Sequence, residues 1–123
     1  MNAKEAARMI DISAVRTAHT LSDIREVVAY AREYRCINVH ALPCWVKTLS
    51  QMLADEPDIY VGAPVGFPSG AHRFETKMLE AMLLIQDGVQ EMDIVMNVGK
   101  FKNREYDYVL RELKSIIGMA KGQ

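Results

Sequence analysis

The sequence predicts an α/β protein built on a parallel sheet, and three observations carry that prediction. Short β-branched and apolar runs alternate with stretches of helical periodicity along the 123 residues. Each strand-and-helix pair repeats after roughly 25 to 30 residues, the spacing expected of parallel strands joined by crossover helices. No linker rich in Gly, Ser and Pro interrupts the pattern, so residues 1–123 are expected to form a single domain.

Four apolar runs rich in β-branched residues are the predicted strands. They are Met9–Val15, Cys36–Leu42, Ile59–Val65 and Glu91–Val98. Pro64 conflicts with the third run, because proline cannot donate a hydrogen bond to a sheet. We therefore expect it at the edge or the end of its strand.

A stretch with helical periodicity follows each run. Thr20 can cap a helix over Leu21–Tyr34. Pro43 suits the first turn of a second helix, because its missing N–H costs nothing there. Two further helices are predicted over Phe74–Asp87 and Tyr106–Ala120.

The composition excludes several classes of partner. The chain has 15 Lys and Arg against 16 Asp and Glu, so it lacks the clustered cations that nucleic-acid binding requires. No apolar stretch approaches the roughly 20 residues that cross a bilayer, so no membrane partner is expected. No apolar run follows a basic patch at the amino terminus, which predicts a cytoplasmic protein without a secretory signal. Cys36 and Cys44 form no CxxC motif, so free thiols are expected.

Polar residues inside the predicted strands fall on one face. Strands of a parallel sheet are normally covered on both faces and are continuously apolar, so such residues need a reason. The alternation of strand side chains groups Met92 with Ile94 and sends Asp93 and Asn97 to the other face. Asp11 is separated in the same way from the isoleucines beside it.

The second run repeats this pattern through Asn38 and His40. Carboxylates inside a sheet are costly unless paired, so Asp93 and Asp11 indicate a site that holds a polar ligand or transfers a proton. Two structural alternatives stay open: Asp11 can cap a helix or pair with a cation, and His40 can be a buried structural histidine. Asp93 lies mid-strand, where capping is not available, and favours function. The histidines show neither HxH nor HExxH spacing, so no metal site is expected.

Two loops follow predicted strands, where α/β folds place ligand-binding backbone. Gly66–Ala71 lacks the GxGxxG and GxxxxGK[ST] patterns, which favours a tight structural turn. In the loop over Asn97–Lys102, the two lysines are expected to be solvated.

In order and over nearly the whole chain, these segments resemble the motifs of the deoxyribose-phosphate aldolase family. Ile10–Ser13 is similar to the family's I-D-H-T and Pro43–Val46 to its N-P-C-Y-V. Val65–Ala71 is similar to I-G-F-P-x-G-A, and Gln90–Gly99 to D-E-I-D-M-V-I-N-I-G. The ordered set makes the resemblance specific.

The resemblance implies a (β/α)8 TIM barrel, of which this chain supplies about the first four βα units. It also implies reversible cleavage of 2-deoxyribose 5-phosphate to glyceraldehyde 3-phosphate and acetaldehyde through a lysine Schiff base, with no cofactor or metal. Asp93 matches the family's catalytic aspartate, which moves protons beside the Schiff base. Asp11, His40 and Asn97 are expected to contact a small phosphorylated sugar or aldehyde. His40 stands where the family usually has a cysteine and Leu42 where it often has asparagine, so substrate contacts can differ on the second strand.

The family's nucleophilic lysine lies on the sixth strand and its cationic neighbour on the seventh, and no lysine of this chain matches either. A complete barrel takes about 250 residues, so this chain supplies about half, and four strands cannot close. The open edges favour a homo-oligomer. Three accounts stay open: a fragment of a longer aldolase, a half-barrel that pairs with a copy of itself, or a truncated product without catalysis.

Three functions compete. The leading one is aldolase chemistry at Asp93. The alternative is a non-catalytic half-barrel that binds a sugar phosphate or acts as an assembly module. A third is a different small α/β enzyme that uses His40 as acid or base.

Overall fold

Four parallel strands form one sheet in the order β1-β2-β3-β4. The structure is a computed structural model that describes residues 1–121. The strands are β1 (Asp11–Ala14), β2 (Asn38–Ala41), β3 (Tyr60–Val65) and β4 (Glu91–Ile94). Helices connect successive strands, which confirms the predicted α/β class and its four βα units.

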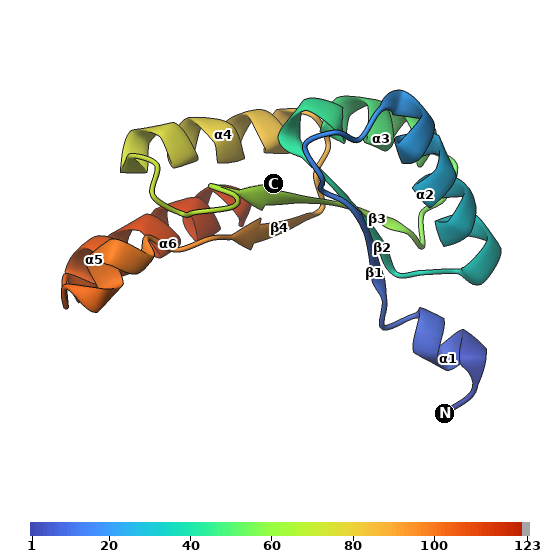
Figure 1. Cartoon of the computed structure of the whole chain (residues 1–123), viewed down its shortest axis with the longest axis horizontal. Coiled ribbons are helices and arrows are strands. Elements are labelled where there is room, and N and C mark those ends of the chain that lie inside the picture. Colours follow the sequence, from blue (N-terminus) through green and yellow to red (C-terminus); the bar gives the residue numbers. More distant parts are fainter. Residues whose placement is uncertain (122–123) are drawn as a thin grey trace.

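Helices α2 (Leu21–Tyr34), α3 (Val46–Met52) and α4 (Phe74–Gln86) arch over one face of the sheet (Figure 1). Helix α6 (Tyr106–Ala120) follows β4 and packs against α4. The predicted helices agree with the structure to within one residue for α2, α4 and α6. No helix in residues 1–121 combines the length and the apolar character needed to cross a membrane.

The helix-covered face of the sheet is apolar, as the alternation of side chains predicts. Ile12, Met92 and Ile94 pack against the core from the edge strands β1 and β4. The central strands and the helices supply the buried side chains of the same cluster, which include Val39, Ala41, Val61, Ala63, Val65, Ile24, Val28, Leu49, Ala81, Leu84 and Ile116.

Three local features differ from the prediction. The helix expected from Pro43 begins as a 3-10 turn, Pro43–Trp45, with the Trp45 N–H donating to the Leu42 carbonyl at 2.9 Å. Two short helices, α1 (Ala3–Ala7) and α5 (Val98–Lys102), were not predicted. Helices this short bury too little surface to produce a clear hydrophobic period in the sequence.

Pro64 lies inside β3, as the fifth of its six residues, and is buried. The pairing of β3 with β2 runs only from Asn38↔Tyr60 to His40↔Gly62. Pro64 therefore follows the last β2 partner, and its missing N–H removes no bond from that ladder. The conflict in the sequence is resolved by the early end of the β2–β3 pairing.

A buried ion pair joins α4 to α6. Lys77 and Glu112 are fully buried, and the Lys77 Nζ donates to Glu112 Oε2 at 2.9 Å and to the Val95 carbonyl at 2.8 Å. Because a charge buried alone is costly, the two side chains depend on each other. Sequence reasoning missed this pair, since 35 residues separate its members.

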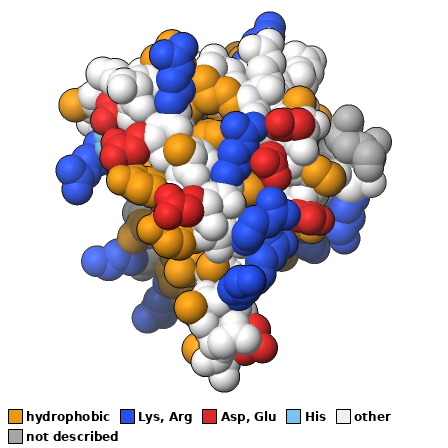
Figure 2. All heavy atoms as spheres, turned by 90° about the vertical axis from the view of Figure 1, so that its right-hand side faces the viewer, with side chains coloured by type: hydrophobic (Ala, Val, Ile, Leu, Met, Phe, Trp, Pro, Cys, Tyr) orange, Lys and Arg blue, Asp and Glu red, His pale blue; other side chains and the backbone are white. Residues whose placement is uncertain are grey.

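On the molecular face at the right-hand side of Figure 1, positive and negative side chains are interspersed (Figure 2). Arg32 of α2 lies 2.7 Å from Asp55 and 3.2 Å from Glu56, and Arg35 lies 3.0 Å from Glu56 and 3.1 Å from Asp58. These arginines are engaged by carboxylates rather than grouped into a basic patch.

Candidate functional site

The polar residues predicted from the strands lie on the inner face, meaning the sheet face away from α2, α3 and α4. Strand pairing places Asp11 beside Asn38, and Ser13 beside His40. His40 is next to Gly62, and Gly62 is next to Glu91. The inner face carries Asp11, Ser13, Asn38, His40, Gly62, Glu91 and Asp93.

His40 and Asp93 approach each other across β3. The distance from His40 Nε2 to Asp93 Oδ2 is 3.2 Å, with the His40 side chain 5% exposed and that of Asp93 70% exposed. The distance is that of an ion pair, but the two groups form no hydrogen bond, and neither imidazole nitrogen has a hydrogen-bond partner among the described residues. The structure thus joins two predicted site residues.

Gly62 makes this approach possible. A Cβ at Gly62 would collide with His40 Nδ1 and with Asn38 Oδ1. Any larger residue would push both side chains away from β3. The missing side chain therefore leaves room for the imidazole and the amide to lie over the strand.

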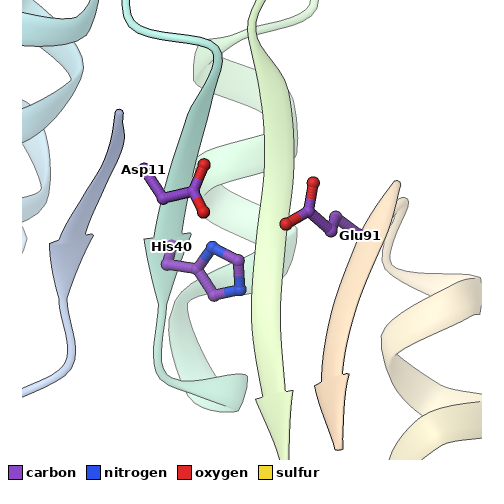
Figure 3. Close-up of side chains that lie close together, drawn as sticks. All are labelled: Asp11, His40 and Glu91. Carbon is purple, nitrogen blue, oxygen red and sulfur yellow. The ribbon is translucent and has the colours of Figure 1, made fainter. Parts of the chain in front are cut away.

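Asp11 and Glu91 complete the polar cluster. One oxygen of each carboxylate and one nitrogen of His40 lie within 4.8 Å of one another. Figure 3 shows the two carboxylates reaching toward each other from opposite sides of β3, with the His40 ring beside them. Within residues 1–121, no Lys or Arg forms an ion pair with Asp11 or Glu91.

Glu91 was missed as a site residue, although a signal existed. It stands two residues before Asp93, so the alternation that selected Asp93 also places Glu91 on the inner face.

The sequence predicted that Asn97 lies on the fourth strand, and this prediction is wrong. Strand β4 ends at Ile94, and Asn97 is the N-cap of α5, where its Oδ1 accepts the Lys100 N–H at 3.1 Å. Asparagine is a favoured N-cap residue, and this local bond competes with continuation of the strand. In the same segment, Lys100 contacts Glu105 at 2.8 Å rather than standing free in solvent.

The loop from Gly66 to Ala71 is a tight turn, in agreement with the sequence interpretation. Gly66 and Gly70 have positive φ, and the Gly70 N–H donates to the Gly66 carbonyl at 2.8 Å. A Cβ at Gly70 would collide with the Met96 carbonyl oxygen, so the turn packs closely on the segment after β4. The turn borders the carboxyl ends of β3 and β4.

The lysines of the chain lie away from the inner face. Within residues 1–121, every lysine is on a helix or at a helix end, and no strand carries one. Lys77 is the only fully buried lysine in residues 1–121, and its amino group is bound to Glu112. In the described part of the chain, the inner face therefore holds an imidazole and carboxylates that can transfer protons, but no amine nucleophile.

Comparisons with known proteins agree with this geometry. A deoxyribose-phosphate aldolase of Klebsiella pneumoniae is 41% identical over 116 residues, covering 93% of this chain and 47% of that protein. One of Enterococcus faecalis is 37% identical over 119 residues, covering 97% and 54% respectively. No protein-family model matches the chain.

Solved structures show the same relationship. The deoxyribose phosphate aldolase of Aeropyrum pernix, described as a tetramer, superimposes with a TM-score of 0.87 at 26% identity, covering 98% of this chain and 50% of that one. The chain spans about half the length of the relatives it matches. Four parallel βα units are half of an eight-stranded barrel, so the fold and the coverage agree. In sequence and in fold, nearly the whole of this chain is similar to deoxyribose-phosphate aldolases, and it spans about half of each.

Proposed function

We propose that the inner face supplies the carboxylates of a Schiff-base aldolase that reversibly cleaves 2-deoxyribose 5-phosphate to glyceraldehyde 3-phosphate and acetaldehyde. The observation that carries this proposal is the convergence of Asp11, His40 and Asp93 on one face of a sheet that relatives named deoxyribose-phosphate aldolase share. Asp93 is the proposed proton-transferring group. Its exposed carboxylate can reach a bound substrate, while the contact with His40 Nε2 orients it.

The other predicted site residues are proposed to bind substrate. Asp11 is an exposed hydrogen-bond acceptor on the inner face, and His40 lies between Asp11 and Asp93. The Oδ1 of Asn97 is used by its cap, so a substrate contact would come from its amide nitrogen. Because no strand in residues 1–121 carries a lysine, the Schiff-base lysine is proposed to come from a segment that corresponds to the rest of the barrel.

The absence of a lysine on the strands favours one alternative, a non-catalytic half-barrel that binds a sugar phosphate or acts as an assembly module. The two functions predict different results when this chain is mixed with the other half of the barrel. An aldolase half gives a complex that cleaves the substrate, whereas an assembly module gives a complex without catalysis.

We also infer a cytoplasmic homo-oligomer. Cys36 and Cys44 are free, which suits a reducing compartment. The sheet has two open edges, at β1 and β4, and one relative is described as a tetramer.

The test is an assay of retro-aldol cleavage with this chain, alone and mixed with the part of the K. pneumoniae relative that lies outside the match. We expect activity only in the mixture. Asp93→Asn should lower kcat by at least about 100-fold, the usual contribution of a positioned proton-transfer group. The control Asp107→Asn, at an exposed aspartate on α6, should leave kcat unchanged. A mixture that forms a complex but remains inactive would support the assembly module.

A further inference from the structure

Helix α4 directs a buried lysine to the end of β4, the strand that carries Asp93. The Lys77 Nζ donates to the Val95 carbonyl at 2.8 Å and to Glu112 Oε2 at 2.9 Å, and both charged side chains are fully buried. Val95 stands two residues after Asp93 and directly follows the last residue of the strand. We propose that Lys77 is a positioning residue, which fixes the backbone at the end of β4 and thereby holds the Asp93 carboxylate in place on the inner face.

Stability alone does not explain a charged pair between α4 and α6. Burial removes both charges from water, and apolar side chains of similar volume are often as stable as a buried ion pair or more stable. Glu112 Oε1 also has no hydrogen-bond partner among the described residues, so the carboxylate is only partly satisfied. What an apolar pair could not supply is the donor to the Val95 carbonyl.

The backbone of Val95 is held from two sides. Its N–H donates at 3.0 Å to the carbonyl of Val65, the last residue of β3, and its carbonyl accepts from Lys77. The ammonium thus supplies a hydrogen bond at the point where β3 has ended.

Glu80 makes a matching contact to the neighbouring strand, three residues further along the same face of α4. Its Oε2 accepts the Gly66 N–H at 2.6 Å, one residue after β3 ends. A Cβ at Gly66 would collide with Lys77 Cε, so the lysine stem packs directly on this turn. Lys77 and Glu80 therefore hold the carboxyl ends of β4 and β3 from the helix-covered side, and active sites of TIM barrels lie at these ends.

Few contacts hold the Asp93 carboxylate in the described part of the chain. Its side chain is 70% exposed, and its contact with His40 Nε2 at 3.2 Å is not a hydrogen bond. Its position therefore depends on the backbone of β4, and a displacement of about 1 Å at a catalytic group can cost about 100-fold in rate. The role of Lys77 in catalysis rests on the proposed function of Asp93 in proton transfer.

The first test needs no turnover and follows the contact between Asp93 and His40 by NMR of the intact chain. It compares the shift of the His40 ring signals that Asp93→Asn causes in the parent and in a double variant. The double variant, Lys77→Met with Glu112→Leu, replaces the buried pair by apolar side chains, so we expect it to fold without the lysine donor. The shift should be at least about twofold smaller in the double variant. Lys114→Met, at an exposed lysine on α6, is the matched control and should behave like the parent.

Far-UV circular dichroism shows whether each variant is folded. Glu80→Leu, which releases the turn on which Lys77 packs, is compared in the same way and should also reduce the shift. Glu80→Gln should restore it, because an amide oxygen can still accept the Gly66 N–H. Equal shifts in the parent and the folded variants, or no shift in the parent, would overturn the positioning role.

The second test measures turnover in the mixture with the complementary half of the K. pneumoniae relative. We expect the double variant to lower kcat by about 10- to 100-fold with KM unchanged, because the proton-transferring group moves while the substrate contacts remain. An unchanged kcat in the double variant would contradict the role of Lys77. An inactive parent mixture would instead contradict the proposed function, and the NMR comparison would still decide whether Lys77 positions Asp93.

Discussion

Gly62 is the residue on which the geometry of the inner face depends. It is a strand residue without positive φ, so its requirement is steric: His40 Nδ1 and Asn38 Oδ1 occupy the space that a Cβ would take. The sequence pattern identified polar residues on β2 and β4, but it gave no reason for a glycine on β3, the strand between them.

Gly62→Ala is therefore expected to destabilise the chain by about 1–3 kcal/mol, the usual cost of overpacking. In a His40→Ala background the cost should be smaller by about 0.5 kcal/mol or more, because the main clash is gone. Urea unfolding of the single and double variants measures this coupling. Gly118→Ala is the matched control, since nothing lies within 4 Å of its added Cβ. Equal costs of Gly62→Ala in both backgrounds would refute the steric account.

The buried pair of Lys77 and Glu112 gives a second prediction. Lys77→Met leaves the Glu112 carboxylate buried without its partner and should cost about 3–5 kcal/mol in the free energy of unfolding. The double variant with Glu112→Leu should recover much of this loss, because two apolar side chains replace the charged pair. Urea unfolding tests both, with the exposed Lys114→Met of α6 as control. A cost of Lys77→Met no larger than that of the control would contradict this role.

At the scale of elements, the Asp23 carboxylate in the first turn of α2 makes part of the folding stability depend on pH. The Thr20 N–H and hydroxyl both donate to Asp23 Oδ2 at 2.6 Å. These bonds hold the pKa of Asp23 below its usual value of 3.8. Since the pKa is lowered in the folded state, the stabilisation is present above about pH 4 and is lost as the pH falls through the folded pKa.

Asp23→Asn should therefore make the free energy of unfolding fall less steeply between about pH 4 and pH 2. Urea unfolding at several pH values gives the slope. Thr20→Val removes the hydroxyl donor but keeps the backbone one, so it should have an intermediate slope. If the free energy of unfolding had the same pH dependence in the parent and in Asp23→Asn, protonation of Asp23 would not contribute to the loss of stability.

The long elements could be predicted because local and tertiary signals agree in them. Leu21–Tyr34 and Tyr106–Ala120 combine a long apolar period with packing against the core, and the structure reproduces their bounds. The end of β4 could not be predicted, because Val95 and Met96 favour a strand while the cap at Asn97 begins a helix. Asp11, His40 and Asp93 were found by alternation alone. The proximity of Glu91 to Asp11 depends on how the sheet brings its two edge strands together, which alternation along a single strand does not show.

At the scale of the whole molecule, an apolar cleft borders the open edge of the sheet. It has a volume of about 490 Å³ and is formed by β4, α4, α6 and the segment before β4. Ile117 of α6 lines it and is 45% exposed. Such a surface is suited to contact with another chain. The other lining residues are Ile85, Val89, Gln90, Met92, Ile94, Ile116, Ala120 and Lys121.

Ile117→Glu is expected to weaken self-association of the chain, because a charge buried in an apolar interface is costly. Sedimentation velocity over a range of concentrations measures the change. Tyr34→Glu, an exposed apolar position at the end of α2, should leave the association unchanged. A parent chain that stays monomeric throughout the range would exclude this cleft as a self-association surface.

In the proposed function, this chain supplies the carboxylates of an aldolase, and the Schiff-base lysine lies on another segment. Borohydride trapping with acetaldehyde, followed by intact mass, tests it most directly on this chain, alone and mixed with the complementary half of the K. pneumoniae relative. We expect no adduct on this chain, and we expect an adduct on the complementary half only when this chain is present. An adduct on a lysine of this chain, or equal trapping on the complementary half with and without this chain, would show that the proposed division of residues is wrong.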